Sequence, residues 1–187
     1  MLILASQSPR RQELLRMAGY DFCAIPANGE EDMSAQSSVG ELTMKLSLAK
    51  AREIFETHGE DVVIGSDTVV AIGGKILGKP KNREEAKEML ELLSGKVHTV
   101  YTGVAIITPD GEETFCSAAE VEFYPLSEAE IEEYLATDEY KDKAGAYGIQ
   151  GFGALLIKGI RGDYYTIMGF PIAEVARRLK KHEKYFK

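Results

Sequence analysis

The stretch Val62-Val63-Ile64-Gly65-Ser66-Asp67-Thr68-Val69-Val70 decides the fold of this 187-residue chain. Its first three residues form a continuous apolar run, which is typical of a buried central strand. Asp67 and Thr68 interrupt the apolar pattern. An ionisable side chain inside such a run must be paired, metal-bound or catalytic to offset the cost of its burial. Asp67 is therefore the leading candidate for a general base or metal ligand. The alternative is a carboxylate at a strand end that accepts backbone hydrogen bonds.

Strand and helix signals alternate on both sides of this stretch. The predicted strands cover residues 2–5, 21–26, 62–64, 98–108, 114–124 and 154–160, with a hairpin at 69–77, and the predicted helices cover 12–18, 39–57 and 82–95 and begin again near 127 and 172. Asn82 precedes Glu85 by three residues, and Ser127 precedes Glu130 in the same way, so both are helix-capping signatures. The sum is a single α/β domain over residues 1–187, with a mixed sheet flanked by helices.

Composition excludes several classes of protein. A formal net charge of −8 argues against binding to nucleic acid or to a membrane surface, which needs a basic face.

The apolar start of the chain is too short for a signal peptide, and no apolar run approaches transmembrane length, so we expect a cytoplasmic protein. Cys23 and Cys116 stand far apart without a CxxC pair, which predicts reduced, buried thiols rather than a disulfide or a zinc site.

A candidate anion site lies between the first strand and the first helix. Ser6-Gln7-Ser8-Pro9-Arg10-Arg11 places Ser8 at the N-cap and Pro9 at the first helical position. Backbone N–H groups, the helix dipole, hydroxyls and guanidiniums would converge there on a polyphosphate. The alternative is a well-capped surface helix with two exposed arginines.

Lysines and an acidic loop supply further candidates. Lys79 and Lys81 flank a proline turn, and Lys50 interrupts a small, apolar helical patch. Each lysine can neutralise phosphate charge, although most lysines are simply solvated. Glu30 and Glu31 can hold the divalent ion that triphosphate chemistry usually needs, and the alternative is a solvated acidic loop.

Residues 142–151 form a glycine-rich segment that also contains a lysine, a tyrosine and a glutamine. Its lack of hydrophobic periodicity suggests backbone packed close to a ligand. Gln150 has an amide donor and acceptor with which to read a base edge. His98 stands alone at a strand start, which is more typical of a hydrogen-bonded structural residue than of a catalyst.

Together these segments resemble the Maf family of nucleotide pyrophosphatases over nearly the whole chain. The segments that carry the resemblance are, in order, Ser6-Gln7-Ser8-Pro9-Arg10-Arg11 with Leu14-Leu15, Lys50-Ala51, Gly65-Ser66-Asp67-Thr68-Val69-Val70, Gly78-Lys79-Pro80, Ser94-Gly95 with His98 and Thr102, Asp142-Lys143-Ala144-Gly145-Ala146-Tyr147 with Gln150-Gly151, and Gly162-Asp163-Tyr164-Tyr165 with Gly169-Phe170-Pro171. Seven motifs in register form a specific signal, whereas one alone would be weak.

The resemblance implies a fold, a reaction and a set of roles. The fold is an elongated mixed sheet with two lobes around a deep cleft, as in Maf and ITPase-like proteins, and the protein is often a homodimer. The reaction is hydrolysis of the α–β phosphoanhydride of a nucleoside triphosphate with a divalent metal cation, magnesium or manganese. Asp67 is the implied general base, and Glu31 lies with it on the metal side. The implied phosphate-binding residues are Ser6, Arg11, Lys50 and Lys79.

The residues at three positions indicate, through the same resemblance, which nucleotide is the substrate. Arg10, Thr68 and Gln150 match the family branch that resembles dTTP/UTP pyrophosphatases. The alternatives are the branch that acts on 7-methylguanosine triphosphate, and a nucleotide-sensing regulator of cell division that binds a triphosphate without turnover. The chain departs from the family pattern at Thr166, where Asn is usual, and at Glu30, where Asp is usual.

Overall fold

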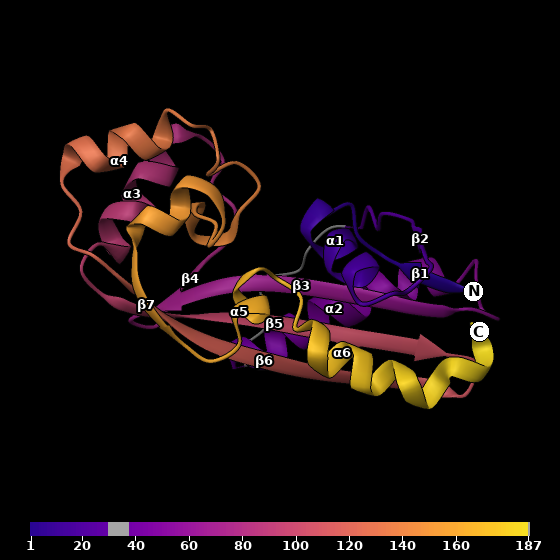
Figure 1. The fold of residues 1–187 in the computed structure, drawn as a ribbon. Coiled ribbons are helices and arrows are strands. Elements are labelled where there is room, and N and C mark those ends of the chain that lie inside the picture. Colours follow the sequence, from indigo (N-terminus) through magenta and orange to yellow (C-terminus); the bar gives the residue numbers. More distant parts are fainter. Residues whose placement is uncertain (30–37, 187) are drawn as a thin grey trace. The chain divides into compact units, whose positions relative to one another are not determined.

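The computed structural model describes residues 1–29 and 38–186, which divide into two compact units (Figure 1). Unit 1 comprises Met1–Asp67, Thr102–Ser117 and Gly169–Lys187, and unit 2 comprises Thr68–Tyr101 and Ala118–Met168. One boundary falls between Asp67 and Thr68, so the residues singled out in the sequence are shared between the units. The predicted cleft between two lobes stays a prediction.

Seven strands of the described residues form one mixed sheet in the order β2-β1-β3-β5-β6-β7, with β4 paired to β3. The strands are β1 (Leu2–Leu4), β2 (Cys23–Ala24), β3 (Val62–Ile72), β4 (Lys75–Leu77), β5 (Val97–Thr108), β6 (Gly111–Phe123) and β7 (Ile157–Arg161). Strand β1 runs parallel to β2 and β3, whereas the β3–β4 and β6–β7 pairs are antiparallel. The predicted mixed sheet flanked by helices is confirmed.

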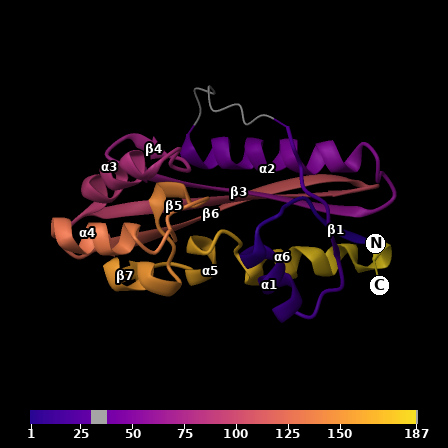
Figure 2. The same cartoon turned by 90° about the horizontal axis from the view of Figure 1, so that it is seen from above.

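In unit 1, helix α2 (Val39–Phe55) covers one side of the sheet, and α1 (Pro9–Met17) and α6 (Ile172–Leu179) lie on the other (Figure 2). A short 3-10 helix, η3 (Lys180–Tyr185), continues α6. Helix α2 begins with a reciprocal capping box between Ser38 and Glu41. Its buried face joins β1, β3 and β5 in a core that includes Ile3, Ala51 and Val63.

In unit 2, α3 (Arg83–Leu93) and α4 (Glu128–Leu135) lie side by side (Figure 1). Irregular helices follow: η1 (Ala144–Ala146), η2 (Gly151–Leu156) and α5 (Tyr164–Ile167). The predicted caps are confirmed, because Asn82 and Ser127 accept the N–H groups of Glu85 and Glu130. No helix in the described part of the chain is long and apolar enough to cross a membrane.

Several local predictions were wrong. Strand β2 has only two residues at the sheet edge, so Cys23 is exposed rather than buried, and Cys116 is half-buried. Both cysteines are free thiols, as expected. The predicted core strand at 154–160 is instead the end of η2 followed by the mostly exposed edge strand β7. The predicted strand at 62–64 continues through Asp67 to Ile72 as one long β3.

Candidate active site

The centre of the candidate site is an ion pair in unit 1 between a buried aspartate and a half-buried lysine. Asp67 lies in the middle of β3 and is 6% exposed, and it is the one buried carboxylate among the described residues. The ammonium of Lys50, on α2, lies 2.5 Å from Asp67 Oδ1. Of the three possibilities for Asp67, namely pairing, metal binding or catalysis, the structure shows the pairing, and the metal and catalytic roles stay predictions. The attraction of two opposite charges at this distance offsets part of the cost of removing them from water.

Two glycines bring Lys50 to Asp67. A Cβ at Gly65 of β3 would lie 2.0 Å from the Ser47 carbonyl oxygen, and one at Gly103 of β5 would lie 2.3 Å from the Thr43 backbone. Such distances are far inside van der Waals contact, so only glycine lets the backbone of α2 lie this close to the sheet. Lys50 follows Ser47 by about one helical turn, which places its side chain against β3.

Arg11 connects three segments of unit 1. Its Nε donates to the Gly169 carbonyl at 2.9 Å, and its Nη1 donates to the Ser66 carbonyl at 2.8 Å and to Ser6 Oγ at 3.2 Å. The Ser66 hydroxyl also donates to the Gly169 carbonyl, at 3.2 Å. Two of the predicted phosphate-binding residues, Ser6 and Arg11, are thus in contact, and their binding of phosphate stays a prediction. Arg11 also fixes the backbone next to Asp67, a role that sequence reasoning missed because backbone carbonyls leave no signal in a sequence.

The start of α1 agrees only in part with the predicted anion site. Ser8 occupies the N-cap position and Pro9 follows in the first turn, but the Ser8 side chain caps no backbone N–H. The Ser8 N–H instead donates to Ser6 Oγ at 3.2 Å. Arg10 is half-buried. The Ser8 side chain therefore does not cap the first-turn N–H groups of α1, although Ser8 occupies the predicted N-cap position.

The remaining predicted residues lie in unit 2 or outside the described residues. Thr68 is half-buried on β3, and Lys79 and Gln150 are exposed. The Gly145 N–H donates to the Gly78 carbonyl at 3.0 Å, so the segment before Lys79 is joined to the glycine-rich loop, residues 142–153. Glu31 and the neighbouring Glu30 fall outside the described residues.

His98 has a structural environment within unit 2. Its side chain is 2% exposed, and its Nε2 lies 2.7 Å from the Tyr147 hydroxyl. Burial lowers the pKa of His98 from 6.5 to about 4 and raises the pKa of Tyr147. Phe123 packs edge-on against both rings. The histidine is therefore neutral near pH 7 and is a hydrogen-bonded structural residue, as predicted, and the structure shows in addition that it anchors the glycine-rich loop to β5.

Thr166 stands where the family usually has Asn. It is completely buried, and its N–H and its hydroxyl both donate to Asp163 Oδ2 at 2.8 Å. Asp163 is the N-cap of α5. Thr166 thus completes the cap of this short helix.

The described residues offer a divalent cation few protein ligands. No group of three or more His, Cys, Asp or Glu side chains gathers within residues 1–29 and 38–186. Magnesium is usually bound by one or two carboxylates together with substrate phosphates and water. A single buried carboxylate, Asp67, fits a cation of this kind, which takes most of its ligands from the substrate.

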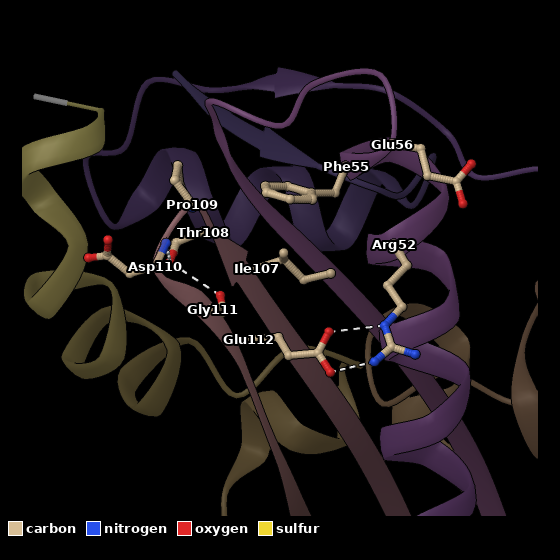
Figure 3. Close-up of a pocket in the computed structure, with 9 residues that line it drawn as sticks. All are labelled: Arg52, Phe55, Glu56, Ile107, Thr108, Pro109, Asp110, Gly111 and Glu112. Carbon is tan, nitrogen blue, oxygen red and sulfur yellow. Dashed lines mark hydrogen bonds and ion pairs between the residues drawn. The ribbon is translucent and has the colours of Figure 1, made fainter.

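A surface pocket of unit 1 lies at the turn between β5 and β6 (Figure 3). Arg52 makes a bidentate ion pair with Glu112 at its edge, and Phe55 and Ile107 supply apolar surface. The nine lining residues are Arg52, Phe55, Glu56, Ile107, Thr108, Pro109, Asp110, Gly111 and Glu112. None of them is a predicted site residue.

The fold and the site define an α/β protein in which a buried aspartate of a central strand pairs with a lysine of the helix packed against it. The chain belongs to the Maf family, because the sequence model of the family described as "Maf-like protein" matches residues 1–182. It is 51% identical over 181 residues to a dTTP/UTP pyrophosphatase of Bacillus cytotoxicus, with 97% of this chain and 95% of the relative covered. A dTTP/UTP pyrophosphatase of Bacillus anthracis is 51% identical over 180 residues, covering 96% and 94%.

Solved structures of low sequence identity are also similar. A nucleoside-triphosphatase, or dITP/XTP pyrophosphatase, from Mycobacterium abscessus has a TM-score of 0.48 and 15% identity and covers 98% of this chain and 97% of its own. The Staphylococcus aureus Ham1 protein has a TM-score of 0.44 and 15% identity and covers 65% of this chain and 71% of its own.

Proposed function

We propose that the protein hydrolyses dTTP and UTP between the α and β phosphates, releasing the nucleoside monophosphate and pyrophosphate. Membership of the Maf family and 51% identity to relatives named dTTP/UTP pyrophosphatase support this proposal. The structural observation that carries it is the ion pair between the buried Asp67 and the half-buried Lys50. A carboxylate fixed by an ion pair on a rigid strand is suited to accept a proton from water.

In the proposed reaction, Asp67 takes a proton from water while the water oxygen attacks the α phosphorus. The bond from this phosphorus to the oxygen that bridges the α and β phosphates breaks, and pyrophosphate leaves. Lys50 contacts Asp67 and adds positive charge where an anionic nucleophile would otherwise be repelled by the polyphosphate. Arg11 holds the Ser66 carbonyl and so fixes the strand that carries the base.

The phosphates would be bound by Ser6, Arg11, Lys50 and Lys79. Asp67 and Glu31 would hold a magnesium or manganese ion, and such an ion neutralises phosphate charge and stabilises the leaving oxygen. The arginine and the lysines of this set also lower the repulsion between the polyphosphate and an anionic nucleophile, independently of the metal ion.

Base selection is assigned to Arg10, Thr68 and Gln150. Gln150 is exposed and its side chain caps no helix, so its amide can meet a ligand. A protein of the 7-methyl-GTP branch would keep its selectivity when these three residues are exchanged. A dTTP/UTP enzyme would lose it.

The test is pyrophosphate release from dTTP, UTP, CTP, dATP, GTP and 7-methyl-GTP with magnesium or manganese. We expect turnover of dTTP and UTP, and we expect Asp67→Asn to lower kcat by roughly 10²–10⁴-fold while triphosphate still binds. Exposed Asp21→Asn is the matched control and should leave kcat unchanged. Binding of triphosphate by the parent protein without turnover would instead identify a nucleotide sensor.

We also propose a cytoplasmic location, action on free nucleotides rather than nucleic acid, and a homodimer. The net charge of −8 supports the second of these, because binding to a phosphate backbone requires a basic surface. Sedimentation of the purified protein tests the homodimer, and a monomer at micromolar concentration would contradict it.

A further inference from the structure

Glu139 organises the part of the glycine-rich loop that follows Gln150. Its Oε1 accepts the N–H of Phe152 at 3.2 Å, and its Oε2 accepts the N–H of Gly153 at 3.3 Å. Both N–H groups lie in the first turn of η2, which the Gln150 side chain does not cap. The carboxylate of Glu139 therefore satisfies backbone donors that would otherwise lack an acceptor in the first turn.

The loop is closed tightly around this carboxylate. Gly151 has φ of +65°, and a Cβ there would lie 2.5 Å from Glu139 Oε1. A Cβ at Gly153 would lie 2.0 Å from the Gly148 carbonyl oxygen, so the two ends of segment 148–153 are in contact. Gln150 lies within this closed segment, two residues before the first backbone N–H that Glu139 accepts.

Glu139 is itself held in place. Its N–H donates to Thr137 Oγ1 at 3.2 Å, and its carbonyl accepts a short hydrogen bond from the Lys143 ammonium. The aliphatic stem of Lys143 lies against Gly148, where an added Cβ would be 2.8 Å from Cε. The glutamate and the loop therefore form one hydrogen-bonded body within unit 2.

We propose that Glu139 is a positioning residue for base selection by Gln150. This inference rests on the proposed function, since it concerns how that activity distinguishes its substrates. An amide discriminates a carbonyl from an amino group on a base edge only when its position is fixed to within about 0.5 Å. The bonds from Phe152 and Gly153 to Glu139 fix the residues that follow Gln150, although Glu139 itself need not touch the nucleotide.

The test compares Glu139→Gln, Gln150→Ala, the double variant and the parent protein. The measured quantity is the ratio of kcat/KM for UTP to that for CTP, which does not depend on the fraction of folded enzyme. We expect Glu139→Gln to lower this ratio roughly tenfold, as the loss of charge-assisted hydrogen bonds predicts. The double variant should match Gln150→Ala, because residues that act through one another are not additive. Glu133→Gln, at an exposed position of α4, is the control.

A second measurement is independent of turnover. Amide hydrogen exchange at Phe152 and Gly153 should become at least roughly tenfold faster in Glu139→Gln than in the parent. Unchanged exchange would overturn the inference, and so would a parental UTP/CTP ratio in Glu139→Gln or losses that multiply in the double variant. Failure of the proposed function would look different, because the parent protein itself would then release no pyrophosphate.

Discussion

Glycines are used differently in the region around Asp67 and in the region around Glu139. At Gly65, glycine provides space, because α2 lies against β3 where any Cβ would meet the Ser47 carbonyl. At Gly151, glycine also provides a left-handed backbone conformation, with φ of +65°. The first region consists of regular elements packed backbone to backbone. The second is a loop held by a few side chains, among them Glu139 and His98, so its position depends on a few hydrogen bonds.

Gly65→Ala should break the first region and have the largest effect. The added methyl group would meet backbone atoms of α2, which cannot move without displacing Lys50 from Asp67. Overpacking of this kind usually costs about 1–3 kcal/mol, and we expect more than about 3 kcal/mol here because the obstacle is backbone. Urea denaturation measures the change. Gly59→Ala, whose Cβ would lie 3.7 Å from the nearest atom, is the control, and equal stabilities of the two variants would refute the close-packing argument.

A change of pH should act on the second region. His98 has a pKa of about 4 in the folded protein and 6.5 when unperturbed, so between these values the unfolded chain binds a proton that the folded protein does not. Stability from this group is therefore complete above pH 6.5 and is lost as the pH falls toward 4. The linkage amounts to about 1.4 kcal/mol per pH unit, or about 3 kcal/mol in all.

Replacing His98 and Tyr147 together by phenylalanine should remove this part of the pH dependence. The double change avoids leaving one buried partner without a hydrogen bond. Unfolding free energies at pH 7 and pH 5 measure the slope, and His58→Gln is the control. If the double variant keeps the slope of the parent, another group must be responsible.

These two regions also differ in what the sequence could predict. Strand β3, helix α2 and the need for a partner at Asp67 follow from apolar patterning and burial cost. The identity of that partner does not follow, because Lys50 reaches Asp67 only where Gly65 and Gly103 let two backbones approach, which is a tertiary effect. The acidic loop that contains Glu31 lies outside the described residues, so its predicted metal role stays a prediction.

Less of the second region could be predicted. Residues 142–151 were singled out as a glycine-rich loop, but Glu139 precedes them and carries no periodic or capping signal of its own. Its carboxylate oxygens accept N–H groups at the start of η2, a 3-10 helix that the sequence did not predict and whose last residues, 154–156, were assigned to a strand. Short irregular helices are fixed by a few long-range hydrogen bonds rather than by hydrophobic periodicity, and this is why sequence reasoning missed the glutamate.

Gly151→Ala should destabilise the protein less than Gly65→Ala does, and this difference tests the contrast between the two regions. A non-glycine residue at this positive φ costs about 1–2 kcal/mol, and the nearest obstacle is the flexible end of the Glu139 side chain rather than backbone. We therefore expect a stability loss below that of Gly65→Ala, together with a lower UTP/CTP ratio because the carboxylate must move. Gly74→Ala separates the two causes, since Gly74 has φ of +80° but nothing within 4 Å of an added Cβ. Gly74→Ala should lose similar stability from strain while keeping the parental ratio. A parental ratio in Gly151→Ala as well would mean that displacement of Glu139 does not reach Gln150, and that the second region tolerates movement that the first does not.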